Sequence, residues 1–191
     1  HQRSALELAA RIGDANARVH SAYNFSLTLR DLGRWDDATD VLEQVSADDA
    51  IARDVLLSAQ AVSALGEIFL LRDRVDKAVD VLRRAVEMSH DAPLAAPARL
   101  DALLNLGRAQ HRRGDHAAAS EAYLLVGRDT TSSGEPVTGA EVRYRLAELL
   151  LDTGDADGAR DWCRQSRTLA RDHGLRTTEA MALRVAGMLS A

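Results

Sequence analysis

Cysteine and proline are scarce in this sequence. Cys163 is the single cysteine in 191 residues, so the chain can form no internal disulfide bond. It lies at an apolar position of a predicted helix, where a small buried side chain is the expected interpretation rather than a reactive thiol. There are only three prolines and no run of alternating β-branched residues, which argues against a sheet. These absences favour a chain built from helices.

Aromatic residues and long apolar runs are also scarce. Aromatics make up 4% of the chain whereas hydrophobic residues make up 46%, so the core must consist mainly of alanine, leucine and valine. Alanine and leucine are strong helix formers. No apolar stretch approaches the roughly 20 residues that span a bilayer, and no signal peptide is visible. We therefore expect a cytoplasmic all-α protein without a membrane segment.

The sequence has no predominantly basic segment. The net charge is −5, whereas a domain that binds duplex nucleic acid is expected to present a basic face. Arginines cluster at Arg112–Arg113 and at Arg143 and Arg145, but acidic residues are interspersed among them. We expect no nucleic-acid partner. Lys77 is the only lysine, and this preference for arginine, with the high alanine content, is typical of a GC-rich bacterial genome.

The motifs that usually carry chemistry are missing. There is no P-loop, G-x-G-x-x-G, H-E-x-x-H, C-x-x-C or G-x-S-x-G. His111 and His116 lie on either side of a predicted turn where two imidazoles could meet, but a metal site needs more ligands. Residues 153–158 resemble the start of an EF-hand loop, yet Arg164 stands where that loop requires a bidentate glutamate. We expect no enzymatic activity, no metal and no cofactor.

A repeat is the feature that the sequence does contain. Small residues recur on the predicted second helix of each unit, at Ala38, Ala78, Ala119 and Ala159. Another set recurs on the predicted first helices, at Ser26, Gly66, Gly107, Ala147 and Gly187. The first four members of both sets keep successive spacings of 40, 41 and 40 residues, and Gly187 follows Ala147 by 40 more. Because small residues let two helices cross closely, the pattern predicts helical hairpins with tight crossings at Gly66 and Gly107.

Residues 62–85 carry a resemblance to a known family. Within this segment the tetratricopeptide repeat (TPR) spacing is kept by Val62, Leu65–Gly66, Phe69, Ala78 and Leu82, with Val for its Trp, Phe for its Tyr and Leu for its Phe. The period of about 40 residues exceeds the usual 34 and resembles the long TPR subtype found in bacterial regulators. The resemblance implies an all-α, right-handed superhelical solenoid of antiparallel helix pairs. Gln110, Arg143 and Ser166 are polar where the family pattern is apolar.

The expected organisation is a single array over residues 1–191. Its repeats are predicted at 15–46, 49–89, 95–128 and 138–173, with half-repeats at 4–13 and 176–190. Ser4 with Glu7, and Thr138 with Glu141, have the spacing of capping boxes, which predicts that helices begin there. The polar, aperiodic stretch 129–136 predicts a loop.

The resemblance also implies where a partner would bind, because the first helices of TPR arrays line a concave groove. The residues that map to this groove are Tyr23, Asn24, Leu27, Arg30, Ser63, Glu67, Leu70, Leu104, Asn105, Arg108, Arg112, Tyr144, Arg145 and Glu148. For any one of them, simple exposure to solvent is the alternative interpretation. The family's carboxylate clamp for chaperone tails needs Lys and Asn where Tyr23 and Leu27 stand, so a chaperone-tail adaptor is not expected.

The sequence therefore predicts a protein- or peptide-binding scaffold, the interaction or sensor segment of a larger bacterial regulatory protein. Arg108 and Arg112 lie one helical turn apart and can hold one carboxylate-bearing segment together, which favours an acidic or amphipathic peptide. Self-association through the terminal helices, giving a homo-oligomer, is the alternative.

Overall fold

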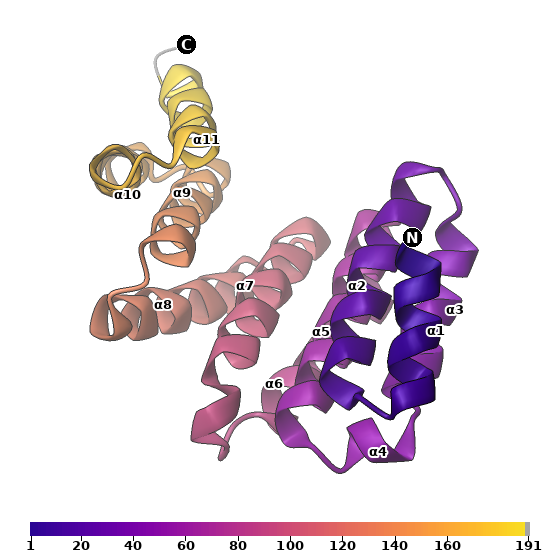
Figure 1. Cartoon of the computed structure of the whole chain (residues 1–191). Coiled ribbons are helices and arrows are strands. Elements are labelled where there is room, and N and C mark those ends of the chain that lie inside the picture. Colours follow the sequence, from indigo (N-terminus) through magenta and orange to yellow (C-terminus); the bar gives the residue numbers. More distant parts are fainter. Residues whose placement is uncertain (190–191) are drawn as a thin grey trace. The chain divides into compact units, whose positions relative to one another are not determined.

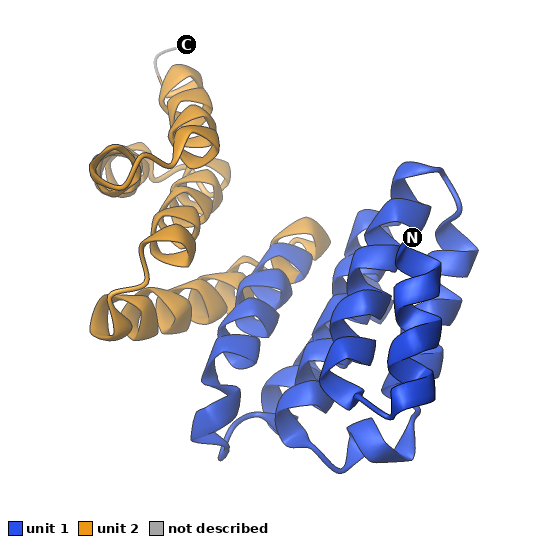
Figure 2. Cartoon of the chain, in the orientation of Figure 1, with its two compact units in different colours: residues 1–109 blue, residues 110–191 orange. Residues whose placement is uncertain are grey.

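The computed structural model describes residues 1–189, and every regular element in this part of the chain is a helix (Figure 1). The chain divides into two compact units, residues 1–109 and residues 110–191 (Figure 2). The all-α prediction is confirmed. The predicted end of the last helix at Ser190 lies outside the described residues.

The first unit is a series of helices joined by short turns. It contains α1 (Gln2–Ile12), α2 (Ala15–Asp31), α3 (Trp35–Ser46), α4 (Asp49–Ala52), α5 (Val55–Leu71), α6 (Val75–Met88), the 3-10 turn η1 (Pro93–Ala95) and most of α7 (Ala96–Arg113). Helix α2 packs against α1 and α3, and α5 packs against α3 and α6. Successive helices that pack after a turn of about three residues run antiparallel, so each pair forms a hairpin.

The second unit continues from Gln110, within the last turn of α7. It contains α8 (His116–Ser133), α9 (Pro136–Asp152), α10 (Ala156–Asp172) and α11 (Arg176–Met188). Helix α9 packs against α8 and α10, and α11 packs against both α9 and α10. The same antiparallel arrangement of neighbours therefore recurs in this unit.

The small residues on the second helices of the repeats lie in the core. Ala38, Ala78, Ala119 and Ala159 are fully buried. A Cβ atom added to Gly66 would lie 2.5 Å from Leu82 Cγ, well inside contact distance, so α5 and α6 cross closely there. The role of Gly107 stays a prediction.

The polar residues in apolar positions of the fourth repeat find partners on the backbone. The Ser166 hydroxyl is fully buried and donates to the Ala140 carbonyl at 2.8 Å. Arg143 Nη1 donates to the Gly139 carbonyl at 2.6 Å. Because a buried polar group is costly only when it lacks a partner, these substitutions fit the repeat packing.

The predicted loop at 129–136 is wrong for most of its length. Helix α8 continues to Ser133 and ends at Gly134, whose φ of 69° is left-handed. Three hydroxyls in this stretch donate to carbonyls four residues earlier: Thr130 to Val126, Thr131 to Gly127 and Ser132 to Arg128. Hydroxyls bonded back in this way are compatible with a helix, whereas composition alone indicated a loop.

Both predicted capping boxes are also wrong. Helix α1 begins at Gln2, before Ser4. Helix α9 begins at Pro136, and the Glu135 carboxylate accepts from the Thr138 amide at 2.8 Å. Proline suits the first helical position because its missing N–H would have had no partner there. The break predicted at 46–49 is real, but a short extra helix, α4, follows it before α5 begins at Val55.

Candidate functional site

In the first unit, polar side chains from two neighbouring first helices contact one another. The Tyr23 hydroxyl of α2 donates to Glu67 Oε2 of α5 at 3.1 Å. Burial, together with the charge and the hydrogen bond of Glu67, raises the pKa of Tyr23 to about 12. Tyr23 is therefore a neutral donor throughout the physiological range, and it fixes the Glu67 carboxylate in place.

The other half-buried or exposed candidates of this unit lie on α2 and α7. Arg30 donates to Asp31 at 2.9 Å, and Arg108 Nη1 donates to Asn105 Oδ1 at 2.7 Å. Asn24 is exposed and Leu27 is half-buried. These groups give the first helices a mixed surface in which charges of both signs are present.

Four of the predicted groove residues are buried. Ser63, Leu70, Leu104 and Tyr144 have exposed fractions of 5%, 1%, 7% and 4%. Tyr144 lies under a cation, because the Arg145 guanidinium is 4.7 Å from the centre of its ring. Its hydroxyl donates to Glu141 at 3.3 Å. These side chains pack beneath the surface of the first helices.

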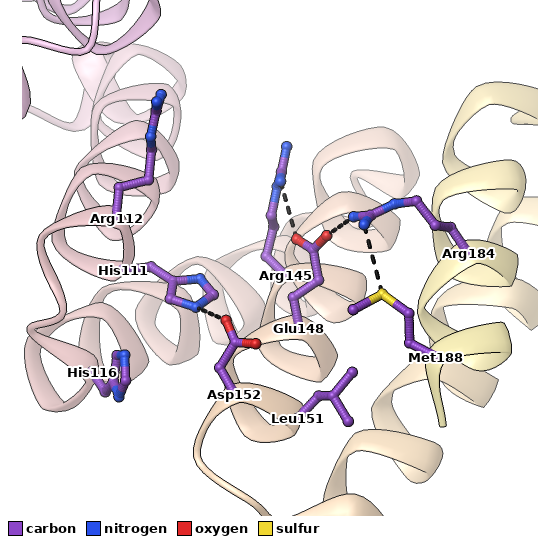
Figure 3. A pocket seen from close by; sticks show the side chains of 9 residues that line it. All are labelled: His111, Arg112, His116, Arg145, Glu148, Leu151, Asp152, Arg184 and Met188. Carbon is purple, nitrogen blue, oxygen red and sulfur yellow. Dashed lines mark hydrogen bonds and ion pairs between the residues drawn. The ribbon is translucent and has the colours of Figure 1, made fainter. Parts of the chain in front are cut away.

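The second unit contains a pocket with a volume of about 340 Å³ (Figure 3). Its lining comes from the end of α7, the start of α8, and helices α9 and α11. The lining residues are His111, Arg112, His116, Arg145, Glu148, Leu151, Asp152, Arg184 and Met188. Three of them, Arg112, Arg145 and Glu148, were predicted as groove residues from the sequence.

Glu148 is held between two arginines in this pocket. Its Oε2 accepts from Arg145 Nη1 at 3.1 Å, and its Oε1 pairs with Arg184 Nη2 (Figure 3). Arg145 also pairs with Glu141 at 3.3 Å. Burial opposes the charge of Arg145, but Tyr144, Glu148 and Glu141 outweigh it, so the pKa of Arg145 is raised. Arg145 stays charged, and the pocket keeps a fixed guanidinium beside a carboxylate.

The imidazoles of His111 and His116 also line the pocket. Gly114, with a φ of 83°, ends α7 in a left-handed turn, and Asp115 caps α8 by accepting from the Ala118 amide. This turn brings the rings of His111 and His116 to 5.7 Å in an edge-to-face arrangement. His111 Nε2 lies 2.8 Å from Asp152 Oδ2.

The other six lining residues were not among the predicted groove residues, although the repeat spacing could have identified several of them. Arg184 follows Tyr144 by one period, and Met188 follows Glu148 by one period. The groove residues were listed only for the four full repeats, although residues 176–190, which contain α11, were predicted as a half-repeat with a first-helix position at Gly187. His111 and Leu151 are likewise one period apart, at the position that Arg30 occupies in the first repeat.

The charged side chains that line this pocket suit it to binding an ionic group.

Among residues 1–189, no group of three or more His, Cys, Asp or Glu side chains is placed to bind a metal ion. Burial raises the pKa of the Cys163 thiol, which donates to the Ala182 carbonyl at 2.9 Å. No described helix is both long enough and apolar enough to cross a membrane.

Comparisons with known proteins identify the repeat. Two tetratricopeptide repeat profiles match the sequence, one over residues 23–93 and the other over residues 100–127 and 140–165. Together they cover more than half of the chain. No match was found among curated proteins.

Solved structures show the same fold at low sequence identity. The apo form of RapI superposes with a TM-score of 0.83 at 10% identity, covering 100% of this chain and 69% of RapI. A signal transduction ATPase with numerous domains and a tetratricopeptide repeat sensor, from Pyrococcus horikoshii, gives 0.77 at 13% identity, covering 98% of this chain and 28% of that one. The Rap conjugation gene regulator of plasmid pLS20, in complex with a Phr peptide, gives 0.72 at 16% identity, covering 86% and 45%.

These structures are TPR-like helical solenoids, and the matched repeats, the helical hairpins and the buried small residues agree with them. The chain belongs to the tetratricopeptide repeat family.

Proposed function

We propose that this chain is a protein- or peptide-binding scaffold and that it serves as the interaction or sensor segment of a larger bacterial regulatory protein. The observation that carries the proposal is the set of polar side chains on the first helices. They are held in place by one another, as in the Tyr23–Glu67 bond of the first unit and the Arg145–Glu148–Arg184 group of the second. Preorganised groups lose little conformational freedom on binding, which favours affinity.

The similar structures support this proposal. One of them is a Rap regulator solved with a Phr peptide, and another carries its tetratricopeptide repeats as a sensor beside an ATPase. This chain spans less than half of the length of each of these two proteins. Its part in a larger regulatory protein is inferred from the similar structure in which tetratricopeptide repeats are the sensor of a multi-domain ATPase.

Direct binding to defined peptides tests the proposal. Synthetic peptides of acidic, amphipathic, basic and neutral composition, each with a fluorescent label, are titrated with the chain and followed by anisotropy. We expect saturable binding of acidic or amphipathic peptides. Arg108→Glu on α7 is expected to weaken it, because it reverses a half-buried charge on a first helix.

Arg83→Glu is the matched control, since it makes the same reversal at an exposed arginine of the second helix α6. If the two charge reversals weaken peptide binding equally, binding depends on the net charge of the chain and not on the position of Arg108. Absence of saturable binding to every peptide class would contradict the proposal.

Self-association is the second candidate. Helix α11 leaves Met181, Leu183 and Met188 exposed by 40%, 44% and 49%, and α1 exposes Leu8 and Ile12. Exposed apolar side chains on terminal helices can be buried against a second copy. Light scattering separates the candidates, because self-association requires a mass that rises with concentration whereas a monomeric receptor keeps a constant mass.

A further inference from the structure

The pocket of the second unit is lined by both guanidinium groups and apolar side chains. Arg112, Arg145 and Arg184 supply three guanidinium groups, and Leu151 and Met188 supply apolar surface. Arg184 Nη1 contacts Met188 Sδ at 3.7 Å, so the cation and the apolar side chain are immediate neighbours (Figure 3). A ligand that fills this pocket must match both surfaces at once.

The contacts of Glu148 indicate that Arg145 and Arg184 are placed to bind a carboxylate. Each oxygen of its carboxylate contacts a different guanidinium, one from α9 and one from α11. Arginine has five N–H donors, and its planar fork suits carboxylates. The Arg184 side chain is 53% exposed whereas that of Glu148 is 14% exposed, so Arg184 is the partner that an incoming carboxylate can reach.

The geometry points to this pocket as the binding subsite for a peptide carboxylate that has an apolar neighbour. The ligand carboxylate competes with Glu148 for Arg184, and the adjacent apolar side chain covers Leu151 and Met188. The inference rests on the proposed peptide-binding function and specifies where and how the acidic part of the peptide is bound. The carboxylate can be an Asp or Glu side chain or the peptide's C-terminus.

Two variants of the same ion pair separate a binding role from a structural one. Glu148→Gln and Arg184→Gln both remove the Glu148–Arg184 pair, so both are expected to lower the thermal midpoint. Glu148→Gln is expected to lower it more, because it also removes the Arg145–Glu148 ion pair. Their effects on a carboxylate ligand are opposite. Glu148→Gln removes the internal competitor and is expected to tighten binding several-fold, whereas Arg184→Gln removes the ligand's partner and is expected to weaken binding by about tenfold.

The matched control is the ion pair between Asp157 and Arg160 at 2.6 Å on α10. The Arg160 side chain is 53% exposed, the same fraction as Arg184, but it does not line the pocket. Asp157→Asn and Arg160→Gln are expected to leave peptide affinity unchanged.

The experiment titrates the full chain and these variants with a labelled peptide in which glutamates stand beside leucines. A second peptide replaces every glutamate with glutamine, and both peptides are made with free and amidated C-termini. Circular dichroism confirms folding of every variant. Loss of binding on amidation assigns the C-terminal carboxylate, whereas loss on glutamine replacement assigns a side chain.

Weaker binding by both Glu148→Gln and Arg184→Gln would show that the pair is structural and overturn the inference. Binding that neither variant changes would place the peptide elsewhere, which overturns the inference but leaves the proposed function intact. Saturable binding of neutral or basic peptides alone would also overturn the inference and leave the proposed function intact. Failure of every peptide to bind would contradict the proposed function itself.

Discussion

At the scale of single residues, two glycines at the same position of the repeat have opposite surroundings. A Cβ atom on Gly66 would clash with the fully buried Leu82, whereas one on Gly187 would meet nothing within 4 Å. The difference arises because α5 is covered by α6 and this face of α11 is open. The sequence marks both as small residues, but only the packing shows which one must be small.

Gly66→Ala is therefore expected to destabilise the chain by about 1–3 kcal/mol, the usual cost of overpacking. Gly187→Ala is the matched control and is expected to be neutral or stabilising, since alanine is favoured over glycine in an exposed helix by about 1 kcal/mol. Urea unfolding followed by circular dichroism measures both. Equal stability of the two variants would mean that α5 and α6 do not cross closely at Gly66.

At the scale of elements, the terminal helix α11 depends on a small apolar contact with α9 and α10. Cys163 and Tyr144 pack against Ala182 and Val185, and the Cys163 thiol donates to the Ala182 carbonyl. Docking of α11 therefore buries the thiol, and burial raises its pKa. Burial keeps alkylating reagents away from the thiol. The raised pKa lowers the fraction of thiolate, which is the reactive form.

Cys163 is expected to react slowly with iodoacetamide in the native chain and fast in denaturant. Val185→Ala, which removes a fully buried contact on α11, should increase the native rate with little change in helix content. Met181→Ala alters an exposed residue of the same helix and should not change the rate. Fast labelling of the unaltered chain would show that α11 is not docked as described. Mass spectrometry follows the reaction.

A second contact links α2 to the short helix α4. Arg18 Nη1 donates to Asp48 Oδ2 at 2.9 Å, and this bond, with the amides of Ala50 and Ile51 at the start of α4, lowers the pKa of Asp48 below its ordinary value of 3.8. A carboxyl with a lowered pKa adds stability above its unfolded-state pKa. That stability is lost as the pH falls through the lower, folded-state pKa.

Asp48→Asn should consequently lower the thermal midpoint at neutral pH, and its difference from the unaltered chain should shrink as the pH falls below about 4. Asp49→Asn, at the exposed neighbouring position, is the control and should show a smaller difference at all pH values. A constant difference between Asp48→Asn and the unaltered chain from pH 7 to pH 3 would contradict the role of the Arg18–Asp48 bond.

At the scale of the whole molecule, the core of each unit is formed by hydrophobic packing between helices. Each unit has its own buried clusters, including one around Leu65 and Leu82 in the first and one around Tyr144 and Cys163 in the second. Repeat proteins of this kind derive stability from each repeat and its nearest neighbours. No described group of side chains is arranged to hold a metal.

Addition of a chelator is therefore expected to leave the thermal midpoint and the helix content unchanged. The measurement is a thermal melt by circular dichroism with and without EDTA, at matched ionic strength. A fall in the midpoint on chelation, reversed by adding back a divalent cation, would show that a metal contributes to the fold.

The sequence by itself determined the repeat, because helix packing needs small residues at fixed intervals and these appear directly as Ala38, Ala78, Ala119 and Ala159. It did not specify every helix end, because both predicted capping boxes lie inside helices that begin earlier. It misplaced the end of α8, where the hydroxyls of Thr130 and Thr131 bond within the helix.

Only the tertiary structure decided which polar residues share a site. The sequence predicted Arg145 and Glu148 as groove residues, but the contact with Arg184 joins side chains 36 residues apart. It likewise could not show that Tyr144 is covered by Arg145 or that His111 meets Asp152. Such contacts depend on how far neighbouring helices approach and how each side chain turns, which repeat spacing along one chain does not specify.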